Sequence, residues 1–311
     1  MDFQTLVDTD AVDIKIEHDE AVMMLGSCFA EDVGNLLKRS MLTLCINPFG
    51  TLYNPRSIAQ SLRRLMADMP FSADELVAYG NLWHSMSHHS RFSSVDKDRA
   101  LQKINAAYAE GVACLRSARH LIVTFGTAYA FSTADGETVA NCHKMPASMF
   151  NRRMLSANEI AGEWVRLIDD IRKFNPHIDI TFTVSPVRHL ADGAHGNQLS
   201  KSTLLLAADS IMAQRPGVCH YFPSYEIMLD QLRDYRFFAA GVCRRTVQVL
   251  VPVRPCTSGL HTLRKGVCTT APPPADRRLR SSRGIPRCHS PRCRHLVGGY
   301  ALRENNNRQT S

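Results

Sequence analysis

The residues best suited to chemistry stand near the N-terminus, in the run Gly26-Ser27-Cys28. An apolar run typical of a buried strand, Ala21–Leu25, precedes them, and a stretch of helical period, Phe29–Leu37, follows. A side chain at such a turn lies beside helix-start N–H groups, which lower a thiol's pKa and can hold an oxyanion. Ser27 and Cys28 are therefore both candidate nucleophiles. The alternative is that Ser27 is an ordinary helix cap and Cys28 a small buried apolar residue.

Two other turns carry candidate substrate-binding groups. In a run dense in turn-forming residues, the N–H of Gly50 and the amide of Asn54 can point into a site. Gly126 and Thr127 follow the strongest predicted strand, His120–Phe125, where a glycine permits close backbone approach to a ligand. The alternative for both turns is that they are only loops.

Histidines supply candidate bases. His189 follows a predicted strand and can act as a general base or an oxyanion donor, or fill a structural role. His88 and His89 are adjacent, so on a strand their side chains point to opposite faces and make poor metal co-ligands. Neither C-x-x-C spacing before residue 240 nor a glycine-rich phosphate loop is present. We therefore expect no metal and no cofactor.

The elements that must position these residues alternate between strand and helix. This alternation predicts an α/β fold with a parallel sheet covered by helices, whose reactive groups lie on loops after the strands. A short β excursion is predicted within 76–92, and a hairpin turn at Asp135-Gly136. The predicted strands are 21–25, 41–46, 120–125, 179–184 and 220–222, and the predicted helices are 29–37, 54–65, 96–116, 156–174, 199–213 and 224–233.

Composition limits the class of protein. With 311 residues, 44% hydrophobic and 21% charged, the chain is expected to be globular rather than disordered. It has no apolar run of the roughly 20 residues that cross a bilayer. Its start, Met1–Gln4, lacks the positive charge and apolar core of a signal peptide. These features predict a cytoplasmic protein with reduced cysteines.

The net charge of +8 belongs to the C-terminal segment alone. From Ala240 onward there are 14 basic residues and two acidic ones, which leaves 23 basic and 27 acidic residues before that point. The same segment holds five cysteines, seven prolines and one aromatic residue, Tyr300. We therefore predict one domain over 1–239 and a basic, irregular or disordered tail over 240–311.

Motifs follow one another in order along the first 239 residues: Leu25–Ala30, Asn47–Pro55, His89–Ser93, Thr124–Ala128, Thr183–His189 and Asp234–Phe238. Together they resemble the GSCFA-domain family. That family is similar to the SGNH (GDSL-type) hydrolases, whose fold is a flavodoxin-like α/β/α sandwich and whose substrates are esters of lipids or sugars. The resemblance therefore implies the same fold and an esterase activity.

The resemblance also implies site roles. In the Gly-Asp-Ser order of the larger superfamily, Ser27 takes the place of the aspartate and Cys28 that of the nucleophile, so either can be the attacking group. Gly50 would be the second oxyanion donor. The turn at Gly126 would be the third, although the superfamily's asparagine is missing there. The base would belong to a D-x-x-H motif soon after residues 235–237.

That motif is absent, because no aspartate precedes a histidine by three residues anywhere from Asp234 on. We therefore expect a slow or inactive esterase unless His189 or His89 replaces the base. The expected substrate is a small-molecule or glycan ester. The alternative function is a non-catalytic protein that binds a glycan or an acyl ligand.

Three interpretations of the tail remain open. An arginine-rich, acid-poor, cysteine-rich segment without period is typical of an out-of-frame reading of GC-rich DNA, and it begins where the family resemblance ends. The segment can also be a genuine unstructured tail. The least favoured interpretation is a basic arm that binds nucleic acid by counterion release.

The frameshift hypothesis is tested by reading the gene in its other two frames from residue 239. We expect one of them to restore a D-x-x-H motif followed by an amphipathic helix. If neither frame does so, the hypothesis is wrong.

Overall fold

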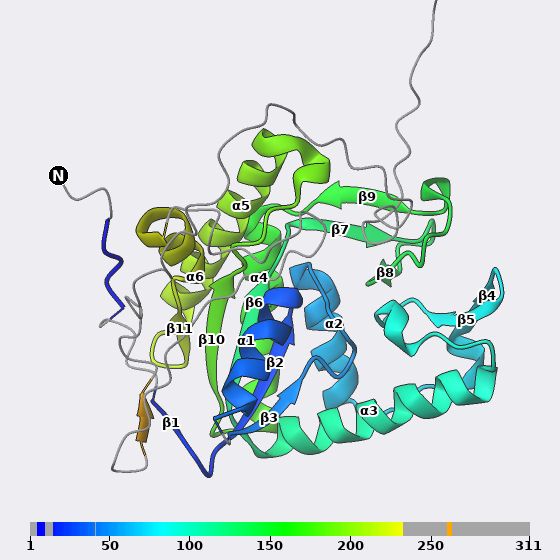
Figure 1. The fold of residues 1–311 in the computed structure, drawn as a ribbon, viewed down its shortest axis with the longest axis horizontal. Helices are drawn as coiled ribbons and strands as arrows, with labels where there is room; N and C mark the ends of the chain where they lie inside the picture. Colours follow the sequence, from blue (N-terminus) through cyan, green and yellow to red (C-terminus); the bar gives the residue numbers. More distant parts are fainter. Residues whose placement is uncertain (1–4, 10–14, 41, 233–259, 263–311) are drawn as a thin grey trace, which may run out of the picture.

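The centre of the molecule is a sheet of five strands, each parallel to its neighbours (Figure 1). The strands are β2 (Ala21–Gly26), β3 (Thr43–Ile46), β6 (Ala118–Phe125), β10 (Asp179–Val184) and β11 (Cys219–Tyr221). The structure, a computed structural model, describes residues 5–9, 15–40, 42–232 and 260–262. The order across the sheet is β3-β2-β6-β10-β11, which is the 2-1-3-4-5 order of a flavodoxin-like fold. The predicted α/β fold is confirmed.

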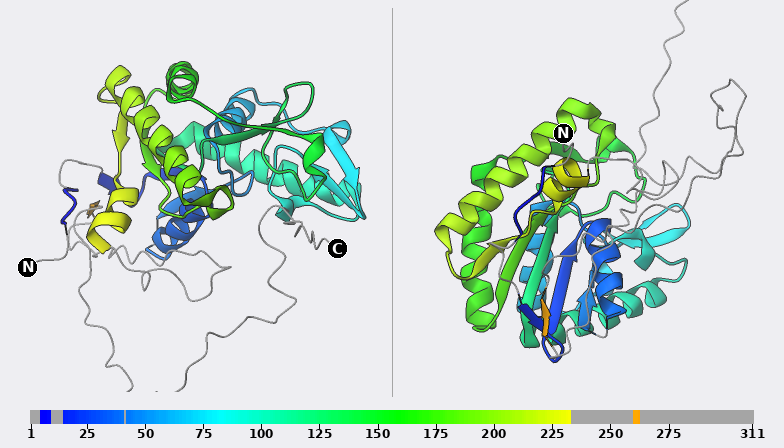
Figure 2. Two further views of the ribbon diagram at one scale, coloured as in Figure 1. Left: turned by 90° about the horizontal axis from the view of Figure 1, so that it is seen from above. Right: turned by 60° about the vertical axis from the view of Figure 1, so that its left-hand side comes forward.

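Helices cover both faces of this sheet (Figure 2). They are α1 (Cys28–Lys38), α2 (Pro55–Met66), α3 (Lys97–Ser117), α4 (Ala157–Phe174), α5 (Gly193–Gln214) and the short α6 (Ser224–Glu226), which continues as the π-helix η5 (Ile227–Leu232). Leu37 of α1 belongs to one buried cluster with Val22 and Met24, whereas α2 to α5 contribute to a larger cluster with Met23 and Leu25. In the described part of the chain, no helix has both the length and the apolar character that a membrane span requires.

The helices begin where the sequence supplies capping groups. Asn54 accepts a hydrogen bond from the N–H of Ser57 at the start of α2, and Pro55 occupies the first position. The predicted capping box at Ser156 and Glu159 is formed at the start of α4. These caps satisfy N–H groups that would otherwise lack partners.

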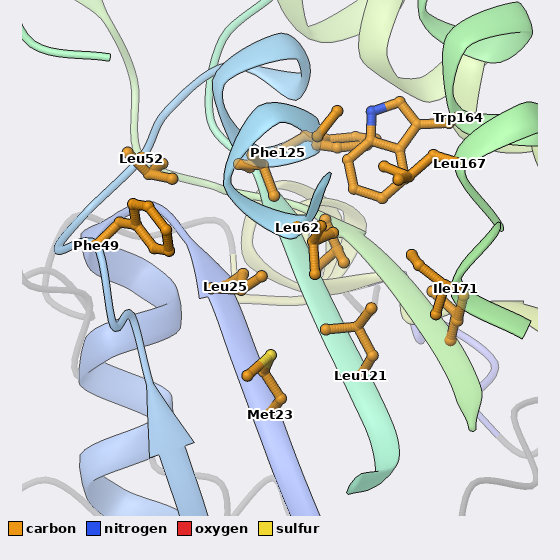
Figure 3. Packing of buried hydrophobic residues seen from close by; sticks show 14 of the residues in the cluster. Met23, Leu25, Phe49, Leu52, Leu62, Leu121, Phe125, Trp164, Leu167 and Ile171 are labelled. Carbon is orange, nitrogen blue, oxygen red and sulfur yellow. The ribbon is translucent and has the colours of Figure 1, made fainter. Parts of the chain in front are cut away.

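The larger cluster is organised around an aromatic group between β6, β10 and α4 (Figure 3). Trp164 is fully buried, and its ring lies 5.2 Å from the rings of both Phe125 and Phe182 in edge-to-face contacts. Its indole N–H donates to the carbonyl oxygen of Pro55, 3.2 Å away. One residue therefore ties α4 to the sheet and to the start of α2.

Two antiparallel units extend from the sheet. One is the hairpin of β4 (Leu76–Tyr79) and β5 (Leu82–Ser85), within the range where a β excursion was predicted. The other joins β7 (Tyr129–Ser132), β8 (Thr138–Val139) and β9 (Asn151–Met154), and it confirms the hairpin turn at Gly136 but adds a strand, β9, that was not predicted. The 3₁₀ turns are η1 (Ala73–Glu75), η2 (Ser90–Phe92), η3 (Ala147–Met149) and η4 (Leu190–Asp192).

Of the predicted tail, the structure describes only β12 (Leu260–Thr262), which pairs antiparallel with β1 (Lys15–Glu17). These three tail residues form a strand where an irregular segment was expected. The domain boundary at residue 239, the rest of the tail and the place of the missing D-x-x-H motif lie outside the described residues.

Gly26 ends β2 in a conformation that other residues rarely adopt, with φ of +142°. A Cβ atom at this position would lie 2.2 Å from the carbonyl oxygen of Thr124 on the neighbouring strand β6. Both observations require glycine where the chain leaves the sheet.

We therefore predict that Gly26→Ala lowers the free energy of unfolding by about 1–3 kcal/mol or more, because overpacking and an unfavourable φ add together. Urea unfolding followed by circular dichroism measures this, with Gly80→Ala as the control for a glycine of positive φ in open space. Equal losses in the two variants would contradict the packing argument.

A group of buried histidines lies beside the β4–β5 hairpin. The His88 ring stacks on Phe49 with ring centroids 4.6 Å apart, and its Nδ1 hydrogen bonds to the Ser85 hydroxyl. Burial lowers the pKa of His88 to about 3 and that of His143 to about 4. Both imidazoles are therefore neutral in the folded protein at neutral pH.

This burial makes folding sensitive to acid. The unfolded chain protonates His88 near pH 6.5, whereas the folded chain resists protonation down to about pH 3, so stability is full above pH 6.5 and falls as pH drops through this window. Between pH 7 and pH 5, we expect the free energy of unfolding to fall by about 2 kcal/mol less in His88→Phe than in the wild-type protein. Urea unfolding at both pH values measures it, with the exposed His195→Phe as control. An undiminished loss in His88→Phe would show that this histidine is not its source.

Candidate active site at the β2–α1 corner

Ser27 lies between β2 and α1, at the N-cap position of the helix. Its side chain makes no capping hydrogen bond, its Oγ has no hydrogen-bond partner, and the residue is 1% exposed. A buried hydroxyl without a hydrogen-bond partner lowers the stability of the fold, so its presence marks a candidate functional group. Ser27 therefore occupies the position of an ordinary cap without acting as one.

Cys28 is the first residue of α1 and is half-buried. Burial raises the pKa of its thiol, and the nearby carboxylates of Asp32 and Glu31 raise it further. The N–H groups of Cys28 and Phe29 act in the opposite direction by hydrogen bonding to the sulfur. The net shift is upward, so the thiol is protonated at neutral pH and needs a base to become a nucleophile.

A loop after β3 fixes the corner. Asn47 is fully buried and its Oδ1 accepts a hydrogen bond from the N–H of Gly26 at 2.9 Å. Its own N–H donates to the carbonyl of Met24, and the N–H of Leu52 donates to the carbonyl of Gly26. Sequence analysis did not single out Asn47. Its only signal was its place in a run of turn-forming residues.

Gly50 and Asn54, in the same loop, are engaged in local structure. The N–H of Gly50 donates to the carbonyl of Asn47 at 2.7 Å, and Asn54 both accepts from the N–H of Ser57 and donates to its hydroxyl. His89 packs over Gly50, where a Cβ atom would lie 2.3 Å from the Cβ of His89. The oxyanion role predicted for Gly50 does not fit this geometry, because its N–H is already bonded.

Gly126 brings the end of β6 against the corner. A Cβ atom on Gly126 would lie 3.4 Å from the Cβ of Ser27 and 3.0 Å from the carbonyl oxygen of Tyr53. That carbonyl accepts hydrogen bonds from the N–H groups of both Gly126 and Thr127, at 2.8 and 2.9 Å. The hydroxyl of Thr127 shares a hydrogen bond with that of Ser200. The Gly126 turn therefore lies against Ser27, and the N–H groups of Gly126 and Thr127 are both bonded to Tyr53.

His189 lies at the same edge of the sheet, on the loop after β10. Its ring makes an edge-to-face contact with Tyr53, with centroids 5.7 Å apart, and its backbone N–H donates to the Oδ1 of Asn197. Tyr53 thus connects His189 to the Gly126 turn. Burial raises the pKa of the Tyr53 hydroxyl, and the charge of Cys28 adds to this effect.

Lys201 is a functional candidate that sequence analysis missed. It lies on α5, is 0% exposed, and its Nζ donates to the carbonyl oxygens of Gly126 and Ser185, both at 2.6 Å. Burial lowers the pKa of Lys201 to about 7, and the charge of Cys28 counters this slightly. The available signal was its spacing, because Lys201 stands three residues before the buried Leu204 and so on the inner face of the helix.

The described residues contain no group of three or more histidine, cysteine, aspartate or glutamate side chains that could hold a metal ion. The described part of the site contains hydroxyl, thiol, imidazole, amine, amide and carboxylate side chains with backbone N–H and carbonyl groups. This set can perform nucleophilic and acid–base chemistry.

A comparison with solved structures gives a distant similarity to an acetyl xylan esterase from the rumen bacterium Butyrivibrio proteoclasticus. The identity is 12% and the TM-score 0.25, and the similarity covers 66% of this chain and 55% of the esterase chain. This chain thus spans little more than half of that protein. No curated protein matches the sequence.

The comparison with family models is more extensive. The GSCFA family model matches residues 21–251, which include β2, the corner with Ser27 and Cys28, and every later element of the sheet. The predicted resemblance is confirmed by this match over most of the chain. Its predicted end at residue 239 is wrong, because the match continues to residue 251. This chain therefore belongs to the GSCFA family, and its first matching segment, Leu25–Ala30, forms the turn where β2 meets α1.

Proposed function

We propose that this protein is an ester hydrolase whose attacking group is the hydroxyl of Ser27 or the thiol of Cys28. The observation that carries this proposal is the buried Ser27 hydroxyl, which has no hydrogen-bond partner at the start of a helix. The turn between the first strand of the parallel sheet and its helix is also where the family resemblance expects a nucleophile. The substrate class that we propose is an acylated carbohydrate or lipid.

The two candidate nucleophiles differ in their surroundings. Ser27 is enclosed between Gly126 and the corner, so a substrate reaches it only if the neighbouring groups move. Cys28 is less buried, but its pKa is raised. The unpaired hydroxyl favours Ser27 and its enclosure opposes it, whereas greater exposure favours Cys28 and its raised pKa opposes it. We therefore retain both residues as candidate nucleophiles.

The oxyanion donors that we propose are the N–H groups at the start of α1. Those of Cys28 and Phe29 belong to the first turn, where N–H groups lack intrahelical partners, and they already face the Cys28 sulfur. An oxyanion formed at this corner would meet both donors and the positive end of the helix dipole. The N–H groups of Gly50, Gly126 and Thr127 are bonded elsewhere and are not part of the proposal.

In the proposed reaction, the attacking oxygen or sulfur adds to the ester carbonyl and loses its proton to a base. The tetrahedral intermediate then expels the alcohol and leaves an acyl-enzyme, which water hydrolyses. Because neither Ser27 nor Cys28 is ionised at neutral pH, the rate depends on that base.

We expect Ser27→Ala or Cys28→Ala to reduce the rate of p-nitrophenyl acetate hydrolysis by at least roughly a thousandfold, because removing a nucleophile removes the covalent route. The variant with the large loss identifies the attacking group. Cys114→Ala, which changes a part-buried cysteine on α3, serves as the matched control. Unchanged rates in both corner variants would overturn the proposal.

The second candidate function is a non-catalytic protein that binds a glycan or an acyl ligand at the same corner. The absence of a D-x-x-H motif after Asp234 favours it. Such a protein would be stabilised against heat by an acylated sugar without hydrolysing it, whereas an enzyme would release the acid.

A further inference from the structure

We propose that Lys201 is the general base of this site, taking the proton from the attacking group at Ser27 or Cys28. This inference rests on the proposed function. It adds the general base that the histidine of the missing D-x-x-H motif would have supplied. Three observations carry it: the burial of Lys201, the partners of its Nζ and its place beside the corner.

The burial of Lys201 is unusual for a lysine. It lies on the inner face of α5, at 0% exposure, among residues of the main core such as Leu204. A charged ammonium in such a place loses its hydration, and lysines are almost never fully buried unless paired. The two partners that the structure gives its Nζ are neutral backbone carbonyls, those of Gly126 and Ser185. The loss of hydration favours the neutral amine, which is the form that accepts a proton.

The geometry of the Nζ leaves one position for the reaction. Besides its bond to Cε, the tetrahedral nitrogen of lysine has three directions, and two of them are directed at the carbonyl oxygens of Gly126 and Ser185. In the neutral amine, N–H bonds occupy these two directions and the lone pair occupies the third. The lone pair, which accepts the proton, is therefore directed away from both carbonyls.

Gly126 places this nitrogen at the corner. The residue whose carbonyl binds Lys201 is the same residue whose α-carbon lies against Ser27, where an added Cβ would be 3.4 Å from the Ser27 Cβ. The charge of a Cys28 thiolate also acts directly on the Lys201 ammonium. Ser27 therefore contacts the residue that binds the proposed base, and Cys28 lies close enough for its charge to act on the Lys201 nitrogen.

The two histidines considered from the sequence have other contacts. The ring of His189 packs against Tyr53, and the Nδ1 of His89 accepts a hydrogen bond from the N–H of Arg91. Among the described ionisable groups, Cys28 on α1 acts on the charge of Lys201. Tyr53, on the loop after β3, is influenced by Cys28 and contacts His189, on the loop after β10.

The proton balance is complete with water as the only co-reactant. The neutral Lys201 amine takes the proton of the Ser27 hydroxyl or Cys28 thiol as the oxygen or sulfur bonds to the ester carbon, and the carbonyl electron pair moves to oxygen. Collapse breaks the ester C–O bond, and the Lys201 ammonium gives its proton to the departing alkoxide. Water then repeats the sequence on the acyl-enzyme, restoring Ser27 or Cys28 and releasing the acid.

The first test measures acylation in the full-length protein. We expect Lys201→Arg to slow the release of p-nitrophenolate from p-nitrophenyl acetate by roughly 10²–10⁴-fold, because a guanidinium donates hydrogen bonds but stays protonated. A role that is only structural would leave a folded Lys201→Arg close to the wild-type rate. Lys173→Met, which changes an exposed lysine on α4, is the control and should keep the wild-type rate.

Comparison with the corner variants separates the two proposals. If Ser27→Ala or Cys28→Ala loses acylation while folded Lys201→Arg retains it, only the general-base role fails. If the wild-type protein is not acylated, or if neither corner variant slows the reaction, the proposed function fails and the base role fails with it.

A second measurement uses the wild-type protein, so its outcome does not depend on whether a Lys201 variant folds. With lysine labelled with ¹³C at Cε, one resonance should titrate with a midpoint near 7, the pKa to which burial lowers Lys201, and the other lysines should titrate near 10.4. Lys173→Met should retain the low midpoint. A spectrum in which every lysine titrates near 10.4 would overturn the inference, because Lys201 would then be protonated at neutral pH.

Discussion

The site depends on the close approach of three backbone segments at the carboxyl ends of β2 and β6. The loop after β3 lies between these ends and bonds to both, through Asn47 and Leu52 to Gly26 and through the Tyr53 carbonyl to Gly126. Glycine is required at Gly26, where a Cβ would lie 2.2 Å from the carbonyl oxygen of Thr124, and a Cβ at Gly126 would be tight, at 3.0 Å from the carbonyl oxygen of Tyr53. This constraint gives the Ser27–Cys28 corner its shape before any catalytic group is considered.

The same tight packing explains why the obvious oxyanion donors are absent. Where segments approach this closely, their buried N–H groups must find partners, and neighbouring carbonyls are the nearest acceptors. The N–H groups of Gly50, Gly126 and Thr127 are bonded in this way. The start of α1 is different, because its first N–H groups have no partner inside the helix. The N-terminus of α1 is therefore the part of this corner that is best suited to bind an anion.

Much of the fold follows from local sequence pattern. The apolar runs predicted the five strands of the main sheet, and the Ser156–Glu159 capping box predicted where α4 begins. The strand β9 was missed because Asn151–Met154 is exposed and has no apolar alternation, so its pairing with β7 is a tertiary effect. For α5, the predicted start at residue 199 was six residues late, because the polar stretch from Gly193 hides the first turns.

The site was less predictable than the fold, for a physical reason. Sequence motifs located Ser27, Cys28 and the Gly126 turn, but whether an N–H is free depends on contacts between distant segments. Lys201 illustrates the limit most clearly, since its chemistry comes from complete burial against the carbonyls of Gly126 and Ser185. Spacing can place a lysine on the inner face of a helix, but it does not say what the lysine meets there.

The central claim is that a covalent acyl-enzyme forms at this corner. The most direct measurement is to mix the full-length protein with p-nitrophenyl acetate, quench with acid before deacylation and map the trapped acetyl group by peptide mass spectrometry. The account predicts one acetyl group, on Ser27 or Cys28. An acetyl group confined to other residues, or hydrolysis with no trapped acetyl at any quench time, would contradict it.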